Sequence, residues 1–506
     1  MQKHQDKTVQ IDALSGEKDT FSSLLQRCIR TAITMRSKGI TPDDTVALCT
    51  FNHLNGVVPY ISSIFIGAKA AALDPTLSLV DTTHLLKQVT PKIIFVVPQA
   101  IELIEKAAEE ISSDVEIVVF GETEKHTKFS DFLQPKDGED SFEPVAPKSL
   151  FDTAIILFSS GTSGMPKGIC LTHYGLLGQT MSMMNLGLDH DIILAFASLY
   201  WITSALYWSI CIIGGTTRLI LPKFDPAVFW EIIHKFKPTC MFVAPTQVLA
   251  AYNQERPKHF KSDSLKDVFI GGGPLLKELL LQVRKAFPNT RVTLAYGQTE
   301  VSGFLSCFKP DNLKEVNAIP HKPTSTGSGI PGLTYKVVDP ETEELLGPYQ
   351  EGELRIKTKF QMNGYYNLDS SDAWDSDGWL KSGDIVYYDE DKCFYVVDRV
   401  KEMLKFQSWH VPPAVIENVL LTHPSIEIAV VIGVPHEIDG DHPMAVVKLR
   451  KGCVEGVTSD DIEKYVEERV HDRQRLRGGV KIVDFIPTTP TGKVKRKEVK
   501  KMILCK

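Results

Sequence analysis

The first half of the chain alternates an amphipathic helical pattern with short, uninterrupted hydrophobic segments. Between residues 21 and 37, pairs of apolar residues recur every three to four positions, which predicts a helix that buries one face and ends before Gly39. Apolar segments of four or five residues follow at 46–49, 93–97, 117–120 and 154–158. Short strands without polar alternation are typical of parallel sheets covered on both faces. The pattern therefore predicts an α/β fold.

The longest uncharged segment covers residues 192–217, which is 26 residues. This length is sufficient for a membrane-spanning helix. Four hydroxyl residues interrupt the segment, and its apolar part ends at Gly214 and Gly215. Residues 192–197 have the length of a buried strand. We therefore expect a buried strand followed by a core helix, and no membrane span.

A second, smaller module is predicted after Asp398. Its pattern gives a helix beginning at Pro412 and Pro413, buried strands at 428–434 and 445–449, and a helix capped at 458–460. Residues 399–506 contain 19 Lys and Arg against 15 Asp and Glu, which leaves 37 against 48 for residues 1–398. We expect an α/β protein with a large N-terminal domain of αβ-layered sheets, residues 1–398, and a small hinged α+β C-terminal domain, residues 399–506.

Composition restricts the class of protein further. The 506 residues are 43% hydrophobic and 24% charged, with a formal net charge of −7, which is typical of a globular chain with more than one domain. Nine scattered cysteines without a C-x-x-C pair argue against zinc sites and disulfides and indicate a reducing compartment. The N-terminal residues lack the apolar stretch of a signal peptide. These features predict an intracellular, cytoplasmic protein.

The strongest chemical signal is a loop rich in glycine and hydroxyl residues directly after the strand at 154–158. Its sequence is Ser159-Ser160-Gly161-Thr162-Ser163-Gly164-Met165-Pro166-Lys167-Gly168. Backbone N–H groups and hydroxyls in such a loop can surround phosphate oxygens. It is not a Walker A loop, because a glycine follows the lysine.

This loop resembles the phosphate loop of the adenylate-forming superfamily, which includes acyl-CoA synthetases, adenylation domains of peptide synthetases and luciferases. Four further segments match the superfamily in order: Tyr296-Gly-Gln-Thr-Glu300, Gly378-Trp-Leu-Lys-Ser-Gly-Asp384, Val397-Asp-Arg-Val-Lys401 and Pro490-Thr-Gly-Lys493. The segment at 476–480 resembles the branch of beetle luciferases and 4-coumarate–CoA ligases. The similarity extends over nearly the whole chain.

The resemblance implies ATP, Mg²⁺ and coenzyme A as cofactors or co-substrates and assigns roles by position. The implied nucleotide-binding residues are Ser159, Ser160, Gly161, Thr162, Ser163, Gly164, Lys167, Gly271, Gly272, Gly273, Tyr296, Gly297, Thr299, Asp384, Arg399 and Lys493. The implied catalytic residues are Thr299, Lys405 and Lys493, and Glu300 is the implied metal ligand. Joining a carboxylate to a phosphate brings two anions together, so such a site needs cations and oriented donors.

The resemblance also implies that the small domain rotates between two half-reactions. Asp398 and Arg399 are the implied pivot, Lys493 serves adenylate formation, and Lys405 lies on the face used for thioester formation. A mobile domain of this kind allows one site to perform two reactions.

Two positions depart from the superfamily pattern. Luciferases carry His-His-Gly-Phe where this chain has Tyr200-Trp201-Ile202-Thr203, which argues against a luciferase. Tyr200 and Trp201 either shape an apolar acyl pocket or fill the core. After Lys405 the superfamily typically has a glycine at the position of Ser408, and a side chain there narrows the path for the thiol of coenzyme A.

Three other patterns are given ordinary structural interpretations. Gly327-Ser-Gly-Ile-Pro-Gly332 fits a dinucleotide motif, but no strand is predicted before it. His436-Glu-Ile-Asp-Gly-Asp-His442 predicts a polar turn rather than a metal site. The basic residues around and after Lys493 are expected on the surface.

The sequence therefore predicts an ATP- and Mg²⁺-dependent enzyme that forms an acyl-adenylate and then an acyl-CoA thioester, on a fatty or other apolar acid. The alternatives are a luciferase-type monooxygenase, a catalytically weak paralogue that binds adenylates and, more remotely, a membrane transporter. The expected partners are a small carboxylic acid, ATP and coenzyme A, with no nucleic acid, membrane span or obligate protein partner. The resemblance allows a peroxisomal location, which the C-terminal tripeptide Leu504-Cys505-Lys506 does not support.

Overall fold

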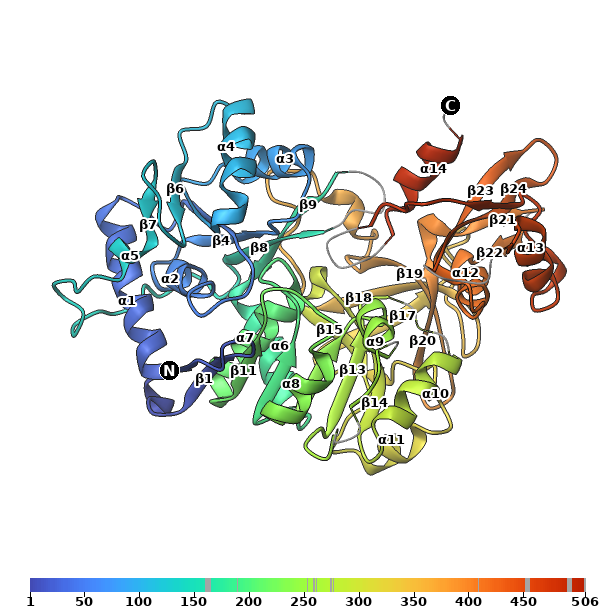
Figure 1. Ribbon diagram of the computed structural model, residues 1–506, viewed down its shortest axis with the longest axis horizontal. Coiled ribbons are helices and arrows are strands. Elements are labelled where there is room, and N and C mark those ends of the chain that lie inside the picture. The colour runs from blue at the N-terminus through green and yellow to red at the C-terminus, as the bar shows by residue number, and fades with distance from the viewer. Residues whose placement is uncertain are drawn as a thin grey trace. The chain divides into compact units, whose positions relative to one another are not determined.

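The computed structural model describes residues 1–159, 165–188, 190–252, 254–257, 260, 262–273, 275, 277–407, 409–450, 456–488 and 494–504. The chain forms two compact units (Figure 1). The first contains Met1–Gly272, Leu279–Tyr335 and Ile356–Leu380, and the second contains Gly273–Glu278, Lys336–Arg355 and Lys381–Lys506. The expected boundary at 398/399 lies inside the second unit and stays a prediction about where the chain pivots.

The first unit contains a seven-stranded sheet in the order β7-β6-β5-β3-β4-β8-β9. Its strands are β3 (Thr45–Cys49), β4 (Lys69–Leu73), β5 (Ile93–Val96), β6 (Glu116–Val119), β7 (Thr127–Lys128), β8 (Thr153–Ser159) and β9 (Lys167–Thr172). All neighbours are parallel except the β8–β9 pair. The four short apolar segments are therefore parallel strands, as predicted, with helices on both sides (Figure 1).

A nine-stranded sheet follows in the order β16-β15-β14-β13-β12-β10-β11-β1-β2. Its strands are β1 (Thr8–Asp12), β2 (Lys18–Thr20), β10 (Ile192–Ala195), β11 (Thr217–Ile220), β12 (Cys240–Val243), β13 (Asp267–Gly271), β14 (Arg291–Gln298), β15 (Gly303–Cys307) and β16 (Ser328–Gly329). The strands from β1 to β14 along this order are parallel, and antiparallel β2 and β15–β16 extend the two edges.

Helices connect these strands. They are α1 (Phe21–Ser37), α2 (Val58–Phe65), α3 (Leu79–Val89), α4 (Ile101–Glu110), α5 (Phe129–Phe132), α6 (His173–Asn185), α7 (Ile202–Gly214), α8 (Phe229–Phe236), α9 (Pro245–Tyr252), α10 (Lys277–Ala286) and α11 (Leu313–Ala318), with 3-10 turns η1 (Gln2–His4), η2 (Pro98–Ala100), η3 (Thr299–Val301) and η4 (Ser371–Ala373). Helix α1 has the predicted bounds, because the Thr20 hydroxyl accepts from Ser23 N–H at its start and Gly39 adopts a positive φ after its end.

The uncharged segment 192–217 is divided between β10 and α7. Strand β10 is buried beyond Ile192 and ends at Ala195, two residues earlier than predicted. Helix α7 has 13 residues and ends at a left-handed Gly215. No helix among the described residues is long and apolar enough to cross a membrane. The expectation of a strand and a core helix is confirmed.

The described cysteines lie in the interior of the protein. Seven of them are buried free thiols: Cys28, Cys49, Cys170, Cys211, Cys240, Cys307 and Cys393. None of these seven contributes to a disulfide. Burial raises the pKa of the Cys170 thiol to about 11, so this thiol is protonated at neutral pH.

The rest of the chain contains two further sheets, and the second of them forms the core of the C-terminal region. One has the order β17-β18-β19-β20, with β17 (Leu333–Val338), β18 (Gly352–Thr358), β19 (Leu380–Tyr388) and β20 (Phe394–Arg399). The other has the order β22-β21-β24-β23, with β25 beside β24; its strands are β21 (Leu404–Phe406), β22 (Trp409–Val411), β23 (Ile426–His436), β24 (Gly440–Leu449) and β25 (Val480–Ile482). Helices α12 (Pro413–Leu421), α13 (Ser459–Glu467) and α14 (Arg496–Leu504) and turns η5 (Val400–Glu402) and η6 (Asp472–Gln474) complete it.

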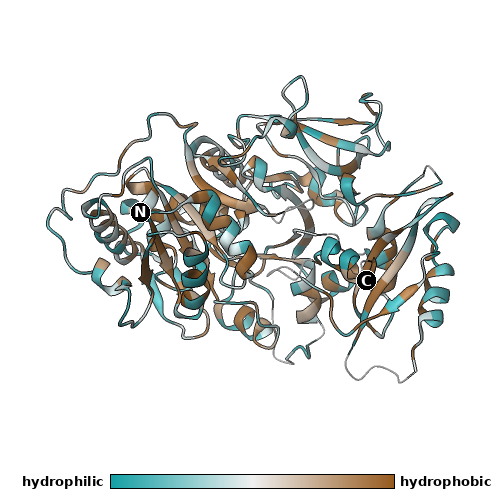
Figure 2. Ribbon diagram, turned by 90° about the horizontal axis from the view of Figure 1, so that it is seen from above, coloured by the Kyte–Doolittle hydropathy of each residue, from teal (hydrophilic) through white to brown (hydrophobic). Residues whose placement is uncertain are grey.

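The C-terminal sheet carries hydrophobic clusters on its two faces. Figure 2 shows hydrophobic colour concentrated on the strands and mixed colour along the helices. The predicted helix starts are confirmed: α12 begins at Pro413, and Thr458 forms a capping box with Asp461 at the start of α13. On α12, Ile416 is buried whereas Val415 is 36% exposed.

Candidate adenylation site

The ends of β13 and β14 bring two of the predicted nucleotide-binding segments together. The two strands are parallel neighbours, with Gly271 opposite Ala295. Gly271 and Gly272 therefore lie beside Tyr296 and Gly297 at the carboxyl ends of adjacent strands. This edge is where open α/β sheets bind ligands.

The backbone at this edge requires glycine. Gly272 has φ +92°, a conformation that other residues rarely adopt. A Cβ added to Gly297 would lie 2.5 Å from the carbonyl oxygen of Gly303, because β14 pairs closely with antiparallel β15 there. Immediately afterwards the chain turns through η3, which carries Thr299 and Glu300, and Ser302 follows in a left-handed conformation.

We expect Gly297→Ala to disturb this turn. The added methyl group must push the β14 and β15 backbones apart, which costs about 1–3 kcal/mol of stability and shifts Thr299 and Glu300. Because a misplacement of about 1 Å can cost about 10²-fold in rate, ATP–pyrophosphate exchange should fall by at least tenfold. The matched control is Gly347→Ala, where the nearest atom is a flexible glutamine side chain at 3.4 Å. Equal exchange rates in the two variants would contradict the assignment.

The predicted phosphate loop closes the hairpin between β8 and β9. Residues 160–164 and the Ser159 side chain lie outside the described part of the chain, but the stem is described, with Ser159 opposite Lys167. The Lys167 ammonium lies 4.7 Å from the centre of the Tyr365 ring, a cation–π distance. The loop therefore begins and ends on a defined pair of strands.

A segment that the sequence analysis missed joins this hairpin to the Thr299–Glu300 turn. Tyr366 N–H donates to Gly168 O at 2.7 Å, and Met362 N–H donates to Glu300 O at 2.8 Å. Burial, and then the charge of Glu300, raise the pKa of Tyr365 to about 12. Tyr365 thus stands close to both Lys167 and Glu300. A pair of tyrosines after Asn363-Gly364 carries no general signal of such a role, which is why the sequence alone did not identify it.

In the second unit, Asp384 and Arg399 form the predicted pair. They are register partners on β19 and β20, and Arg399 Nε lies 2.8 Å from Asp384 Oδ1. Asp384 is buried, whereas the Arg399 side chain is 40% exposed. A buried carboxylate beside a guanidinium is a charged acceptor of the kind to which ribose hydroxyls donate.

The predicted pivot residue Asp398 is held by backbone donors. Its carboxylate accepts from Arg399 N–H at 2.7 Å and from Ala414 N–H at 3.0 Å, in the first turn of α12. Burial raises the pKa of Asp398, and these two hydrogen bonds oppose the rise. Asp398 therefore connects β20 to the beginning of α12.

Lys405 lies on β21 with its side chain 62% exposed, and its ammonium contacts Glu341 Oε1 at 2.6 Å. His410 Nε2 lies 3.7 Å from the same oxygen. The partner is equally exposed, so solvent screens the pair and its contribution to stability is small. Ser408 lies outside the described residues. The proposed role of Lys405 in thioester formation stays a prediction.

Lys493 also lies outside the described residues, but the residues on either side of the undescribed segment are paired. Thr488 and Val494 form a β-bridge, and Lys495 N–H donates to Pro487 O at 2.9 Å. Residues 489–493 therefore connect two paired positions. The loop leads directly into α14 through Arg496.

Arg496 corrects the expectation that the basic residues after Lys493 lie on the surface. Its guanidinium contacts Glu402, and its Nη1 lies 2.7 Å from Glu417 Oε1. The side chain is only 22% exposed. Burial raises the pKa of Glu417, and the charge of Arg496 opposes that rise. This partly buried cluster, Glu402, Glu417 and Arg496, fixes the start of α14 against α12 and β23.

Tyr200 and Trp201 stand where luciferases have two histidines, and the two residues differ in burial. Tyr200 is buried in the core of the seven-stranded sheet, and its ring lies 6.2 Å from that of Phe158. Trp201 is only partly buried and packs edge-on against Tyr200 at 5.1 Å. Tyr200 therefore fills the core, while Trp201 retains the exposure that a pocket residue needs.

The dinucleotide reading of residues 327–332 has no structural support. In a dinucleotide motif the glycines follow a strand and begin a helix. Here β16 lies inside the motif and β17 follows it. Gly327 adopts a positive φ, and an added Cβ would overlap the backbone at Cys307. These glycines serve strand packing.

Comparison with known proteins identifies the family. The AMP-binding enzyme family model matches residues 1–366, and the model of the AMP-binding enzyme C-terminal domain matches residues 415–493. The chain belongs to this family of adenylate-forming enzymes, which activate acids with ATP. It has the α/β fold of the family, with a large N-terminal and a small C-terminal domain, as predicted.

Its relatives include both branches named from the sequence. It is 29% identical to luciferin 4-monooxygenase of Nipponoluciola cruciata, over 97% of this chain and 90% of that protein. It is 31% identical to 4-coumarate–CoA ligase 2 of Nicotiana tabacum, over 95% and 89%. The solved luciferase-like enzyme of the nonluminescent mealworm Zophobas morio is 38% identical, with a TM-score of 0.76 over 79% of this chain and 94% of that chain. The resemblance is confirmed.

Proposed function

We propose that the protein joins an apolar carboxylic acid to AMP, releasing pyrophosphate from ATP, and then transfers the acyl group to the thiol of coenzyme A. The observation that carries this proposal is the edge of the nine-stranded sheet where Gly271 and Gly272 lie beside the turn of Thr299 and Glu300. The hairpin of the phosphate loop is tied to that turn through residues 362–366.

The residues of the first unit would hold the nucleotide. Gly271, Gly272 and Tyr296 would contact the adenine, and the Thr299 hydroxyl would contact the α-phosphate. Glu300 offers a carboxylate of the kind that Mg²⁺ prefers, and its charge already acts on Tyr365. The metal, when bound, supplies positive charge to the leaving pyrophosphate.

The residues of the second unit would complete the reaction. Asp384, held by Arg399, would accept the ribose hydroxyls. Lys493 would contact both the attacking carboxylate and the α-phosphate, which reduces the repulsion between two anions in the transition state. The acyl-adenylate is a reactive mixed anhydride, so the site must exclude water until the thiol attacks.

The proposal is tested by a pyrophosphate-release screen over short, medium, long and aromatic acids, with and without coenzyme A. We expect release with an apolar acid and a thioester product, identified by mass spectrometry, when coenzyme A is present. Nucleotide binding without pyrophosphate release on any acid would contradict the enzymatic function and favour a paralogue that only binds adenylates.

Ser408→Gly provides a separate prediction for the second half-reaction. Removing the side chain at this position should widen the path of the thiol. Thioester formation from preformed acyl-adenylate should therefore rise several-fold, which corresponds to an activation free energy lower by about 1 kcal/mol at most. Adenylate formation should not change. Ser141→Gly is the control, because it makes the same substitution at an exposed serine outside the proposed site and leaves Ser408 in place. An unchanged or lower thioester rate in Ser408→Gly would show that the serine is no obstacle.

A luciferase-type oxygenation is the second candidate function. It is favoured by the 29–30% identity to three luciferin 4-monooxygenases over 97% of the chain. The Tyr200–Thr203 segment argues against it, because no imidazole is present there. Light output with luciferin, ATP, Mg²⁺ and oxygen, compared with thioester yield on the same acid, separates the two activities.

A further inference from the structure

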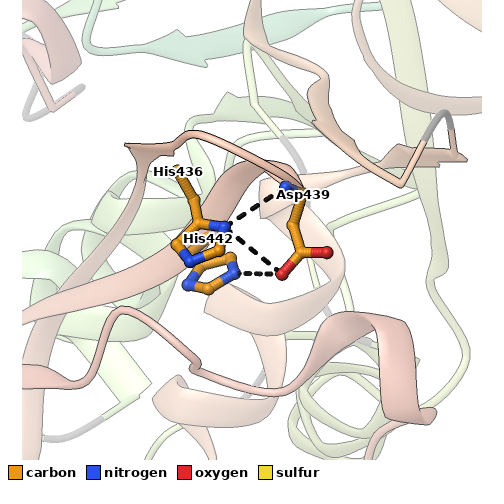
Figure 3. Close-up of side chains that lie close together, drawn as sticks. All are labelled: His436, Asp439 and His442. Atoms are coloured by element: carbon orange, nitrogen blue, oxygen red, sulfur yellow. Dashed lines mark hydrogen bonds and ion pairs between the residues drawn. The ribbon is translucent and has the colours of Figure 1, made fainter.

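The turn between β23 and β24 gathers three side chains with metal-binding atoms. His436 ends β23, Asp439 lies in the turn, and His442 lies on β24. The register pairs Val434 with His442 and His436 with Gly440, so the two histidines are diagonal neighbours on one face of the hairpin. Figure 3 shows both rings beside the Asp439 carboxylate.

The distances between the candidate ligand atoms of the three residues are close to those between the ligand atoms of a bound metal ion. Asp439 Oδ2 lies 2.9 Å from His442 Nε2 and 3.4 Å from His436 Nδ1. One candidate ligand atom from each residue can be chosen so that all three lie within 4.8 Å of one another. Ligands of a tetrahedral ion with bonds of about 2.0–2.2 Å are about 3.4 Å apart. The two imidazole rings are stacked with their centres 4.0 Å apart, so they must turn out of this arrangement to direct one nitrogen each at a single ion.

The Asp439 carboxylate is held in place by Gln407, which directly follows β21. Gln407 Nε2 donates to Asp439 Oδ1 at 2.8 Å, and Gln407 N–H donates to Asp439 O at 2.8 Å. The side-chain contact occupies Asp439 Oδ1, and Asp439 Oδ2 is directed toward the two histidines. Metal ligands are commonly oriented by an outer hydrogen bond of this kind. Asp439 N–H also donates to His436 Nδ1 at 3.2 Å, and a metal ion bound at that nitrogen would replace this hydrogen bond.

We propose that His436, Asp439 and His442 form a binding site for one divalent transition-metal ion of the zinc class. Two imidazole nitrogens and one carboxylate oxygen suit Zn²⁺, Co²⁺ or Ni²⁺ better than Mg²⁺. His436 is 42% exposed, which leaves a position for water or another ligand. The ion would fix the turn to Gln407, directly after the strand that carries Lys405. The sequence predicted only a polar turn here, and the folded hairpin adds the convergence of the three side chains.

The test is a titration of the full-length protein with Co²⁺ and Zn²⁺, followed by calorimetry and by the visible absorption of bound Co²⁺. All proteins carry Cys453→Ser and Cys505→Ser, so that these two thiols do not contribute. We expect one ion per chain and a metal-dependent rise in thermal stability. His442→Ala and Asp439→Asn should weaken binding by about 100-fold, and Gln407→Ala by about tenfold, at the low end for an outer partner.

His321→Ala, an exposed histidine outside the turn, is the matched control and should bind as the parent does. Thermal unfolding without metal separates loss of the site from loss of the fold, and His436→Asn provides a smaller change if His442→Ala does not fold. Absence of binding in the parent, or equal affinity in the parent and the ligand variants, would overturn the proposal. Pyrophosphate release is measured separately, so failure of the metal site leaves the proposed adenylation untouched.

Discussion

Replacing Lys493 by alanine is expected to slow acyl-adenylate formation by about 10²–10³-fold. The reason is electrostatic: the attacking carboxylate and the α-phosphate are both anions, and a single ammonium would contact both as their bond forms. The measurement is ATP–pyrophosphate exchange with the acid identified by the screen. The second half-reaction, started from synthetic acyl-adenylate and coenzyme A, should keep its rate, because the role proposed for Lys493 is confined to the first half-reaction.

The matched control for this variant is Lys497→Ala. It removes the same charge four residues away, from an exposed position on α14. We expect its exchange rate to remain within about twofold of the parent, a difference of less than about 0.5 kcal/mol. Equal losses in the two variants would mean that general basic charge, rather than a bridging lysine, supports the reaction.

Replacing Arg496 by alanine is expected to destabilise the C-terminal region by about 1–3 kcal/mol, because it leaves two partly buried carboxylates without their cation. Arg496 contacts both Glu402 and Glu417, and it also donates to Val431 O at 2.6 Å. Chemical denaturation measures the loss. Lys497→Ala again serves as the control, with a change of no more than about 0.5 kcal/mol for an exposed position.

The loss in Arg496→Ala should also depend on pH. Burial raises the pKa of Glu417, so in the folded state this carboxyl keeps a proton above its ordinary pKa of about 4.3. The folded state then binds more protons than the unfolded state, and stability falls as pH rises above that value. Without Arg496 the pKa rises further, so the deficit should grow between about pH 4 and pH 7. A deficit that does not vary with pH would contradict the ionic explanation.

Much of the fold could be predicted from local patterns. The bounds of α1, the parallel strands β3, β5, β6 and β8, and the capped start of α13 follow from periodicity and capping residues. These features depend on neighbours in sequence, so a single chain contains the information. The division of residues 192–217 into β10 and α7 was likewise readable from glycine and hydroxyl positions.

Part of the candidate site comes from sequence motifs and part from the fold. Glycine and hydroxyl loops, the Thr299–Glu300 pair and the Asp384–Arg399 pair belong to motifs with a recognisable order. Tyr365 was missed, since it meets Lys167 and Glu300 through contacts between segments about 200 and about 65 residues apart in the sequence. Arg496 was misjudged as surface charge, because burial of a cation depends on which carboxylates the fold brings to it.

The amino-acid sequence by itself determined the chemistry that this chain offers: a phosphate loop, a hydroxyl beside a carboxylate, and a lysine near the C-terminus, all in the order of one enzyme family. Only the tertiary structure decided which of these groups share an edge, which cation is buried, and that His436, Asp439 and His442 face one another. The physical reason is that residue types are fixed along the chain, whereas burial and distance are set by strand register and packing between remote segments.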